Sequence, residues 1–176
     1  MSFIFLLLAF NMVAVADSFE ADSKNLALNL KQSLVKELTQ KINDKGTVEA
    51  VTFCQANVGV IAKSAAKEYL GRYEFGRTSH KWRNEKNAPT DWMSTYLSKY
   101  QGKKKDDIRK ASLIHRLPNG KRVYLEPLFV QPLCLQCHGE SLRPEVKEKV
   151  SQLYPKDKAT GFKLNEFRGF IWIKEK

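Results

Sequence analysis

Apolar residues recur every fourth position along the first part of the chain. Between residues 18 and 43 the repeating positions, flanked by lysine and glutamine, are Leu30, Leu34, Leu38 and Ile42, with Val35 beside them. This spacing predicts an amphipathic helix. Gly46 is placed to end it.

A second helix is predicted to start at Thr47, a suitable N-cap residue, and to run to about Leu70. Its apolar positions fall on one stripe: Val51, Cys54, Val58, Ile61 and Ala65. Cys54 is therefore expected to face an apolar surface.

The rest of the chain predicts strands with short helices inserted. Weak alternation over 71–84 suggests a strand and a turn, and Pro89 and Asp91 open a short helix with apolar positions at Trp92, Met93, Tyr96, Leu97 and Tyr100. Asn119-Gly120 separates two extended runs, 111–117 and 122–130, which is typical of a hairpin. A polar helix over 144–153 and a last strand over 168–174 complete an α+β pattern.

The first sixteen residues have the features of a signal peptide. A short apolar run, Phe3 to Phe10, is followed by the small residues Ala14 and Ala16. No basic residue precedes the run, so an uncleaved anchor is the alternative. We expect cleavage before Asp17, export to the periplasm or an equivalent compartment, and no membrane span afterwards. The predicted organisation is a signal peptide at 1–16, a helix at 17–46 and one domain at 47–176.

The chain is strongly basic. It has 30 Lys+Arg against 19 Asp+Glu, a formal net charge of +11. The basic residues are spread along the sequence without a nucleic-acid-binding motif, so nucleic acid is not the expected partner. Such a charge favours a partner protein with an acidic surface.

Cys134-Leu135-Gln136-Cys137-His138 is the strongest motif in the chain, because C-x-x-C-H is the pattern of c-type haem attachment. Two thiols three residues apart can add to the two vinyl groups of one haem as thioethers. The histidine that follows can then bind the iron.

Other chemistries fit this segment less well. A structural zinc site needs a second pair of ligands, and the remaining candidates, Cys54, His80 and His115, are scattered. A thioredoxin-like pair needs a βαβ context. A local disulfide is the simplest alternative, although three cysteines are an awkward number for an exported disulfide scaffold.

Several spaced segments carry a resemblance to a known family. They are Gly76 to Asn84 with Asn87-Ala88-Pro89, Glu126-Pro127-Leu128, Cys134 to Gly139, Tyr154 to Phe162, and Arg168-Gly169. From Thr47 onwards the chain resembles the single-haem c-type cytochromes with a PAS-like fold, the Tll0287-like haem-binding domain. That family also occurs as the exported sensory part of bacterial signalling proteins.

The resemblance implies a PAS-like antiparallel sheet with flanking helices, preceded by N-terminal helices, and one covalent haem c. It implies thioethers at Cys134 and Cys137 and iron ligation by His138. It also places Cys54 on a helix where members of the family can hold a cysteine near the haem. His80 departs from the family pattern, which has an aliphatic residue there.

The sixth iron ligand is open at this stage. Cys54 is the first choice, and a thiolate would give a low potential; a buried cysteine can equally serve as a small apolar residue. His80 is second, with a place near the propionates as its alternative. His115 and Met93 are expected to be structural. Arg77, Lys81 and Arg83 could neutralise the haem propionates or form a solvated basic face.

Two functions are compatible with this reading. A soluble electron carrier or redox component would use the basic surface to meet its partner. A haem-based sensor of redox state or of a small ligand would act through a separate partner. Enzymatic haem chemistry needs acid–base residues at an open distal site, and we do not expect it.

Overall fold

The structure is a computed structural model that describes residues 18–108 and 112–176; the predicted signal peptide lies outside these ranges. Its helices are α1 (Ser18–Ala65), α2 (Asp91–Tyr100), α3 (Leu135–His138) and α4 (Pro144–Leu153). Its strands are β1 (Tyr73–Thr78), β2 (Leu113–Arg116), β3 (Arg122–Phe129) and β4 (Phe167–Glu175). No helix within the described ranges has both the length and the apolarity to cross a bilayer.

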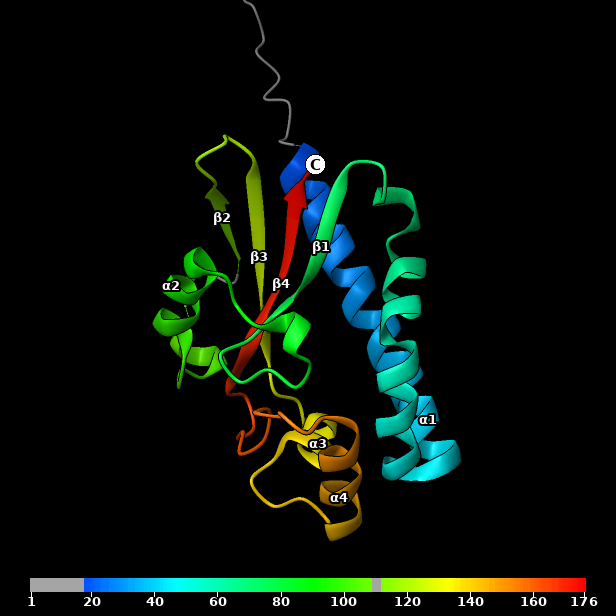
Figure 1. The fold of residues 1–176 in the computed structure, drawn as a ribbon. Helices are drawn as coiled ribbons and strands as arrows, with labels where there is room; N and C mark the ends of the chain where they lie inside the picture. The colour runs from blue at the N-terminus through cyan, green and yellow to red at the C-terminus, as the bar shows by residue number, and fades with distance from the viewer. Residues whose placement is uncertain (1–17, 109–111) are drawn as a thin grey trace, which may run out of the picture.

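The four strands form one antiparallel sheet in the order β1-β4-β3-β2 (Figure 1). The last strand of the chain therefore lies in the middle of the sheet. The hairpin expected around Asn119-Gly120 joins β2 to β3, with Arg116 paired to Arg122. The α+β prediction, with an antiparallel sheet and an N-terminal helical segment, is confirmed.

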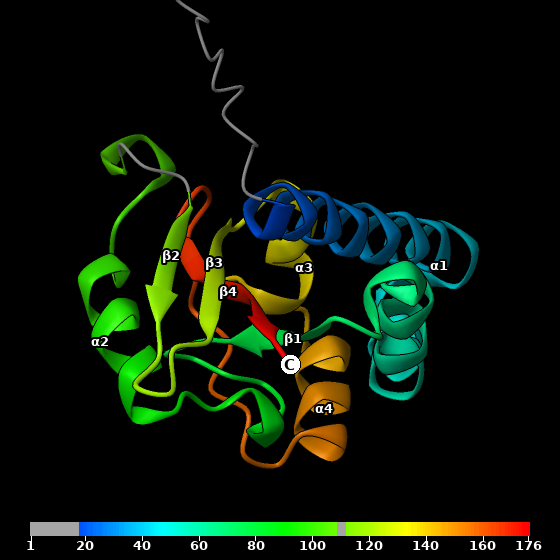
Figure 2. The same cartoon turned by 90° about the horizontal axis from the view of Figure 1, so that it is seen from above.

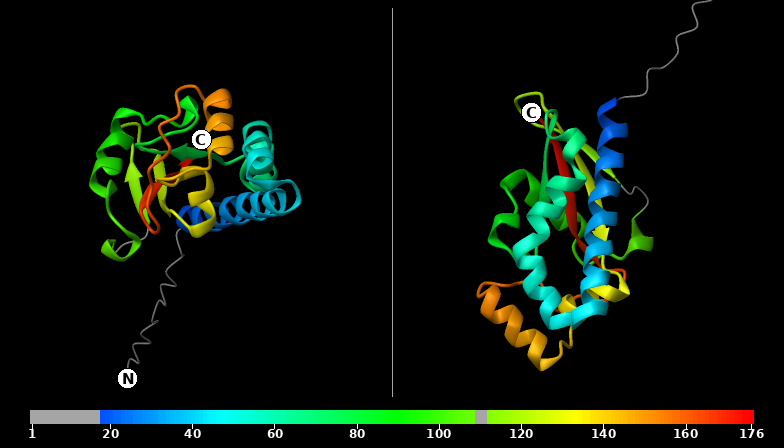
Figure 3. Two further views of the ribbon diagram at one scale, coloured as in Figure 1. Left: turned by 90° about the horizontal axis from the view of Figure 1, so that it is seen from below. Right: turned by 90° about the vertical axis from the view of Figure 1, so that its right-hand side faces the viewer.

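The two predicted N-terminal helices form a hairpin, described together as α1. Gly46 lies between its arms with φ 80° and ψ 172°, a conformation that glycine adopts without steric cost. The arms run side by side in opposite directions (Figure 3). Gly46 thus ends the first helix, as predicted, and reverses the chain.

Helices cover both faces of the sheet (Figure 2). On one face α1 contributes Phe19, Leu26, Ala27 and Leu30 to a core with Tyr73, Tyr124, Ile171 and Ile173. On the other face α2 contributes Leu97 and its aromatic residues to a core with Val123, Leu125, Phe167 and Phe170. After β3 the chain continues into α3 and α4, which lie beyond the end of the sheet (Figure 1).

The predicted apolar stripe of the first arm is wrong in its second half. Leu30 is buried, but Leu34, Leu38 and Ile42 are only half-buried and Val35 is 53% exposed. The buried stripe lies earlier, at Phe19, Ser23, Leu26, Ala27 and Leu30. Periodicity identified a helix correctly, but it could not show which part of the helix lies against the sheet.

Gly169 is the position in the sheet where a side chain is least tolerated. Its φ is 141°, and an added Cβ would lie 2.2 Å from the backbone oxygen of Thr78 on the neighbouring strand. We expect Gly169→Ala to lower the free energy of unfolding by at least about 3 kcal/mol, from backbone strain and overpacking together. Urea unfolding measures this.

Gly59→Ala is the matched control, because Gly59 lies within α1 and nothing is within 4 Å of an added Cβ. It should stabilise the protein by about 0.5–1 kcal/mol through helix propensity. Equal effects of the two substitutions would contradict the strain argument.

Glu175 joins the end of β4 to the start of β3. It accepts hydrogen bonds from Arg122 Nη2 at 2.6 Å and from the Arg122 backbone nitrogen at 2.8 Å, and the Arg122 side chain lowers the pKa of Glu175. A lowered carboxyl pKa contributes stability above the unfolded-state pKa and loses it as pH falls through the folded-state value. We expect Glu175→Gln to remove less than about 1 kcal/mol at pH 7 and almost nothing at pH 2, measured by urea unfolding at both pH values.

Candidate functional site

The C-x-x-C-H segment lies at the end of the sheet, on the single turn of α3 and the short 3-10 helix before it (Figure 1). Pro132 starts this turn, and the backbone nitrogen of Cys134 donates to Gln131. Cys134 and Cys137 are both half-buried free thiols. Helical backbone at the motif keeps both thiols and the imidazole of His138 within little more than one turn.

His138 is held in one orientation by backbone hydrogen bonds. Its Nδ1 lies 2.6 Å from the carbonyl oxygen of Ala159, which can only accept, so Nδ1 carries the proton and Nε2 keeps its lone pair. The His138 carbonyl in turn accepts from the backbone nitrogen of Phe162 at 3.0 Å. Burial, together with Arg168 and Arg83, holds the pKa of His138 well below its usual value, so the imidazole is neutral.

Arg83 and Asp157 form a nearly buried ion pair beside this segment, with side chains 13% and 8% exposed. Arg83 Nε and Nη2 each lie 3.1 Å from one carboxylate oxygen of Asp157. Nη2 also donates to the carbonyl oxygen of Cys137 at 2.6 Å. Nε and Nη2 of Arg83 are therefore engaged within the protein, which argues against its expected role at a propionate.

Cys54 comes from the second arm of α1 and faces the same space as α3. Burial raises the pKa of its thiol, and Arg77 and Arg83 oppose that effect. Burial raises the pKa of the Cys137 thiol, and nearby Cys54 adds to that increase. The surroundings of Cys54 are thus mixed, with arginine as well as apolar groups.

The second arm is fixed to α3 and α4 by further contacts. Thr47 Oγ1 donates to Gln136 Oε1 within the motif at 2.7 Å. Val51 packs with Val146 and Val150 of α4 in a small core that also touches Cys137. These contacts hold Cys54 relative to the motif although the two are far apart in the sequence.

Arg77 lies near both Cys54 and Cys134. Burial lowers the pKa of this guanidinium, and the two cysteines oppose the shift. The side chain is half-buried, and no acceptor for it is found among the described residues. A guanidinium in this position retains its capacity to bind a carboxylate.

Lys81 lies on the outer side of the site. Its Nζ is 4.8 Å from the centre of the Phe162 ring and 3.3 Å from the carbonyl oxygen of Thr160. It therefore covers the segment that holds His138, and its position does not bring it toward Cys54.

His80 packs behind His138. Its ring is stacked on Phe167 at 6.0 Å and meets Phe162 edge-on at 5.8 Å. Phe162 also contacts the His138 ring at 6.5 Å. Because a single phenyl ring separates the two histidines, His80 lies on the His138 side of the site and is poorly placed to be the second iron ligand.

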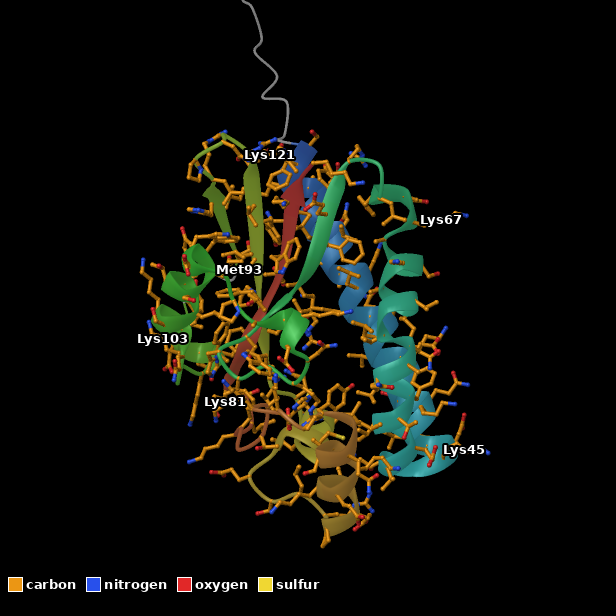
Figure 4. The ribbon with its side chains drawn as sticks, in the orientation of Figure 1. Lys45, Lys67, Lys81, Met93, Lys103 and Lys121 are labelled. Carbon is orange, nitrogen blue, oxygen red and sulfur yellow. The ribbon has the colours of Figure 1, made fainter. Side chains whose placement is uncertain are left out.

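His115 and Met93 are structural, as expected. His115 Nδ1 is 2.9 Å from the hydroxyl of Tyr96, and its ring stacks on Trp92 at 5.1 Å. Met93 is buried in α2, on the face of the sheet opposite α1 (Figure 4).

Arg168 is a buried residue of the site that the sequence did not reveal as such. Its Nη1 donates to Ser79 Oγ at 2.7 Å and to the Lys81 carbonyl at 2.9 Å, and its guanidinium lies 4.8 Å from the Phe162 ring. Burial lowers its pKa to about 9. The Arg168-Gly169 pair was the only sequence signal, and it gave no indication of a contact with residues 79–81.

The arrangement is better suited to an organic cofactor than to a bare metal ion. Within 18–108 and 112–176, no three His, Cys, Asp or Glu side chains are grouped so that they could bind one ion. Instead α3 and the 3-10 helix before it present two thiols and one imidazole, while α1 and β1 present a third thiol and an arginine. This set fits a haem, with two attachment thiols, a neutral nitrogen ligand and a cation for its carboxylates.

The fold is shared with a solved protein. The structure described as "Crystal structure of the cyanobacterial heme-protein Tll0287" matches with a TM-score of 0.64 and 24% sequence identity, covering 90% of this chain and 95% of that one. The family model of the Tll0287-like family matches residues 11–175. The chain therefore belongs to the Tll0287-like family, and the match includes the N-terminal hairpin as well as the region after Thr47. No curated protein matches the sequence.

Proposed function

We propose that this protein is an exported c-type cytochrome with one haem attached through Cys134 and Cys137 and ligated by His138. The observation that carries the proposal is the fixed imidazole: His138 is neutral, its Nδ1 is committed to Ala159, and it directly follows two free thiols. Membership of the Tll0287-like family supports the same cofactor.

Attachment requires only the two thiols already present on α3 and on the 3-10 helix before it. Each thiol adds its S–H across one vinyl group, so both thioethers form without an oxidant. The short turn keeps the two sulfurs on one side and His138 immediately after them. When bound, the haem supplies reversible one-electron chemistry at its iron.

Cys54 is the proposed second iron ligand. It approaches from α1, whereas His80 is separated from His138 only by Phe162. Its raised pKa makes the free group a thiol, so binding to iron releases a proton. A thiolate ligand would favour ferric iron and a low potential.

Arg77 is the proposed partner of a haem propionate. Its guanidinium lies near Cys54 and Cys134, and no acceptor for it is found within residues 18–108 and 112–176. Arg83 is paired with Asp157, and Lys81 lies over Phe162.

The proposed activity is low-potential electron transfer in an exported compartment. The positive charge is distributed over the surface: Figure 4 shows labelled lysines from the β2–β3 turn (Lys121) to the tip of the α1 hairpin (Lys45). A net charge of +11 favours encounter with an acidic redox partner.

Optical spectra test the proposal. Protein exported from a host with cytochrome c maturation is examined oxidised and reduced, with and without carbon monoxide. A covalent haem whose reduced spectrum is unchanged by carbon monoxide supports six-coordination and electron transfer. A covalent haem that binds carbon monoxide readily would favour a sensor, and protein without haem would refute the cytochrome assignment.

A further inference from the structure

We propose that Arg83 and Asp157 are positioning residues for His138, and that their balanced charges set the reduction potential of the haem; this inference rests on the proposed function. The pair is remote in sequence from the motif, yet it contacts both the backbone of the motif and the segment that fixes the imidazole. Arg83 reaches the carbonyl of Cys137 at 2.6 Å, one residue before His138.

Arg83 and Asp157 both contact Ala159, whose carbonyl oxygen accepts the hydrogen bond from the imidazole of His138. Asp157 Oδ1 accepts from the backbone nitrogen of Ala159 at 3.0 Å, and the carbonyl of the same Ala159 accepts from His138 Nδ1 at 2.6 Å. Asp157 thus holds the residue on which the tautomer of His138 depends. Such groups behind a metal-bound histidine orient the ring and tune its basicity.

Arg83 and Asp157 carry opposite charges, and both lie close to His138, the proposed iron ligand. Arg83 Nη2 is 3.5 Å from the Ala159 carbonyl, and Arg83 is among the groups that lower the pKa of His138. Asp157 compensates this positive charge through two 3.1 Å contacts. Since both side chains are nearly buried, removing one would leave the other charge poorly screened.

Removing either charge alone should shift the midpoint potential of the haem, in opposite directions for Asp157 and Arg83. Ferric haem carries one more positive charge than ferrous haem. Asp157→Asn keeps an acceptor for Ala159 but removes a negative charge, so the midpoint potential should rise. Arg83→Met keeps the aliphatic length but removes a positive charge, so the potential should fall. The double variant should return close to the wild-type value.

A matched control exists on the same two segments. Glu85 and Lys156 form an ion pair at 3.0 Å, but their side chains are 58% and 68% exposed. Glu85→Gln therefore removes a contact between the same parts of the chain without removing a buried charge. Its midpoint potential should equal that of the wild type.

The test is a redox titration of the haem-loaded variants, with thermal unfolding followed in parallel. Opposite shifts for Asp157→Asn and Arg83→Met support the proposal. If both lower thermal stability while the potential is unchanged or shifts in one direction, the pair is merely structural and the inference is overturned.

A second readout separates this inference from the proposed function. Nitrogen-15 NMR of the protein before haem attachment, when Nε2 of His138 is not bound to iron, reports which nitrogen of His138 carries the proton. We expect the Nδ1–H form in the wild type and in Glu85→Gln, and a mixture of tautomers in a second double variant, Arg83→Met/Asp157→Ala, which removes both the donor to Cys137 and the acceptor for Ala159. An unchanged tautomer in this second double variant would refute positioning, whereas a wild type lacking haem would refute the cytochrome assignment alone.

Discussion

Replacing Cys134 and Cys137 together by alanine should abolish covalently bound haem. The two thiols lie on one short turn, and each forms one of the two thioethers that we propose. His138 would remain with its Nδ1 bonded to Ala159, but one nitrogen ligand does not retain haem through denaturation. The measurement is haem staining after denaturing electrophoresis, confirmed by the mass of the intact chain.

Cys54→Ala is the control for this experiment. It removes the third half-buried free thiol but neither attachment position, so the denatured chain should still carry the full mass of one haem. Either single variant, Cys134→Ala or Cys137→Ala, should retain one thioether at reduced yield. Undiminished covalent haem in the double alanine variant would exclude attachment at this motif.

The second large effect is expected at Cys54. A thioether in place of a thiolate removes negative charge from the iron and stabilises the ferrous state. Cys54→Met should therefore raise the midpoint potential, on the order of a few tenths of a volt, because axial ligands set haem potentials over about 0.8 V. Redox titration measures the shift, and Cys54→Ala should additionally make the ferrous protein bind carbon monoxide.

Val58→Ala distinguishes ligation from packing. Val58 lies one helical turn after Cys54 on the same arm of α1 and is also half-buried. Its truncation should cost about 1 kcal/mol of stability and leave potential and spectrum unchanged. If Cys54→Ala behaves like Val58→Ala, Cys54 is a packing residue and the low-potential assignment is wrong.

The elements that the sequence predicted well are those with local signals. The reversal at Gly46, the Asn119-Gly120 hairpin and the short helix beginning at Asp91 depend on neighbouring residues and are found in the structure. The two thiols and the imidazole of the motif also lie close together in the chain. Their grouping could therefore be predicted without knowledge of the fold.

The roles of the arginines could not be predicted because they depend on distant contacts. Arg83 meets Asp157, 74 positions later, and Arg168 meets Ser79, 89 positions earlier. A run of basic residues beside a motif looks the same whether its side chains bind a propionate or pair within the protein. Only the packing of β1 against β4, and of the 154–162 segment against α3, separates Arg77 from Arg83.

The contact between α1 and α3 joins two parts of the chain that are synthesised at different times. Thr47 and Gln136 are 89 positions apart and are hydrogen-bonded in the finished fold, with the second arm of α1 packed beside the motif. A chain emerging N-terminus first has this arm long before it has the attachment thiols. On the proposed function, an arm that docked only after attachment would leave Cys134 and Cys137 open to the assembly apparatus. Its docking would then bring Cys54 to the newly bound haem.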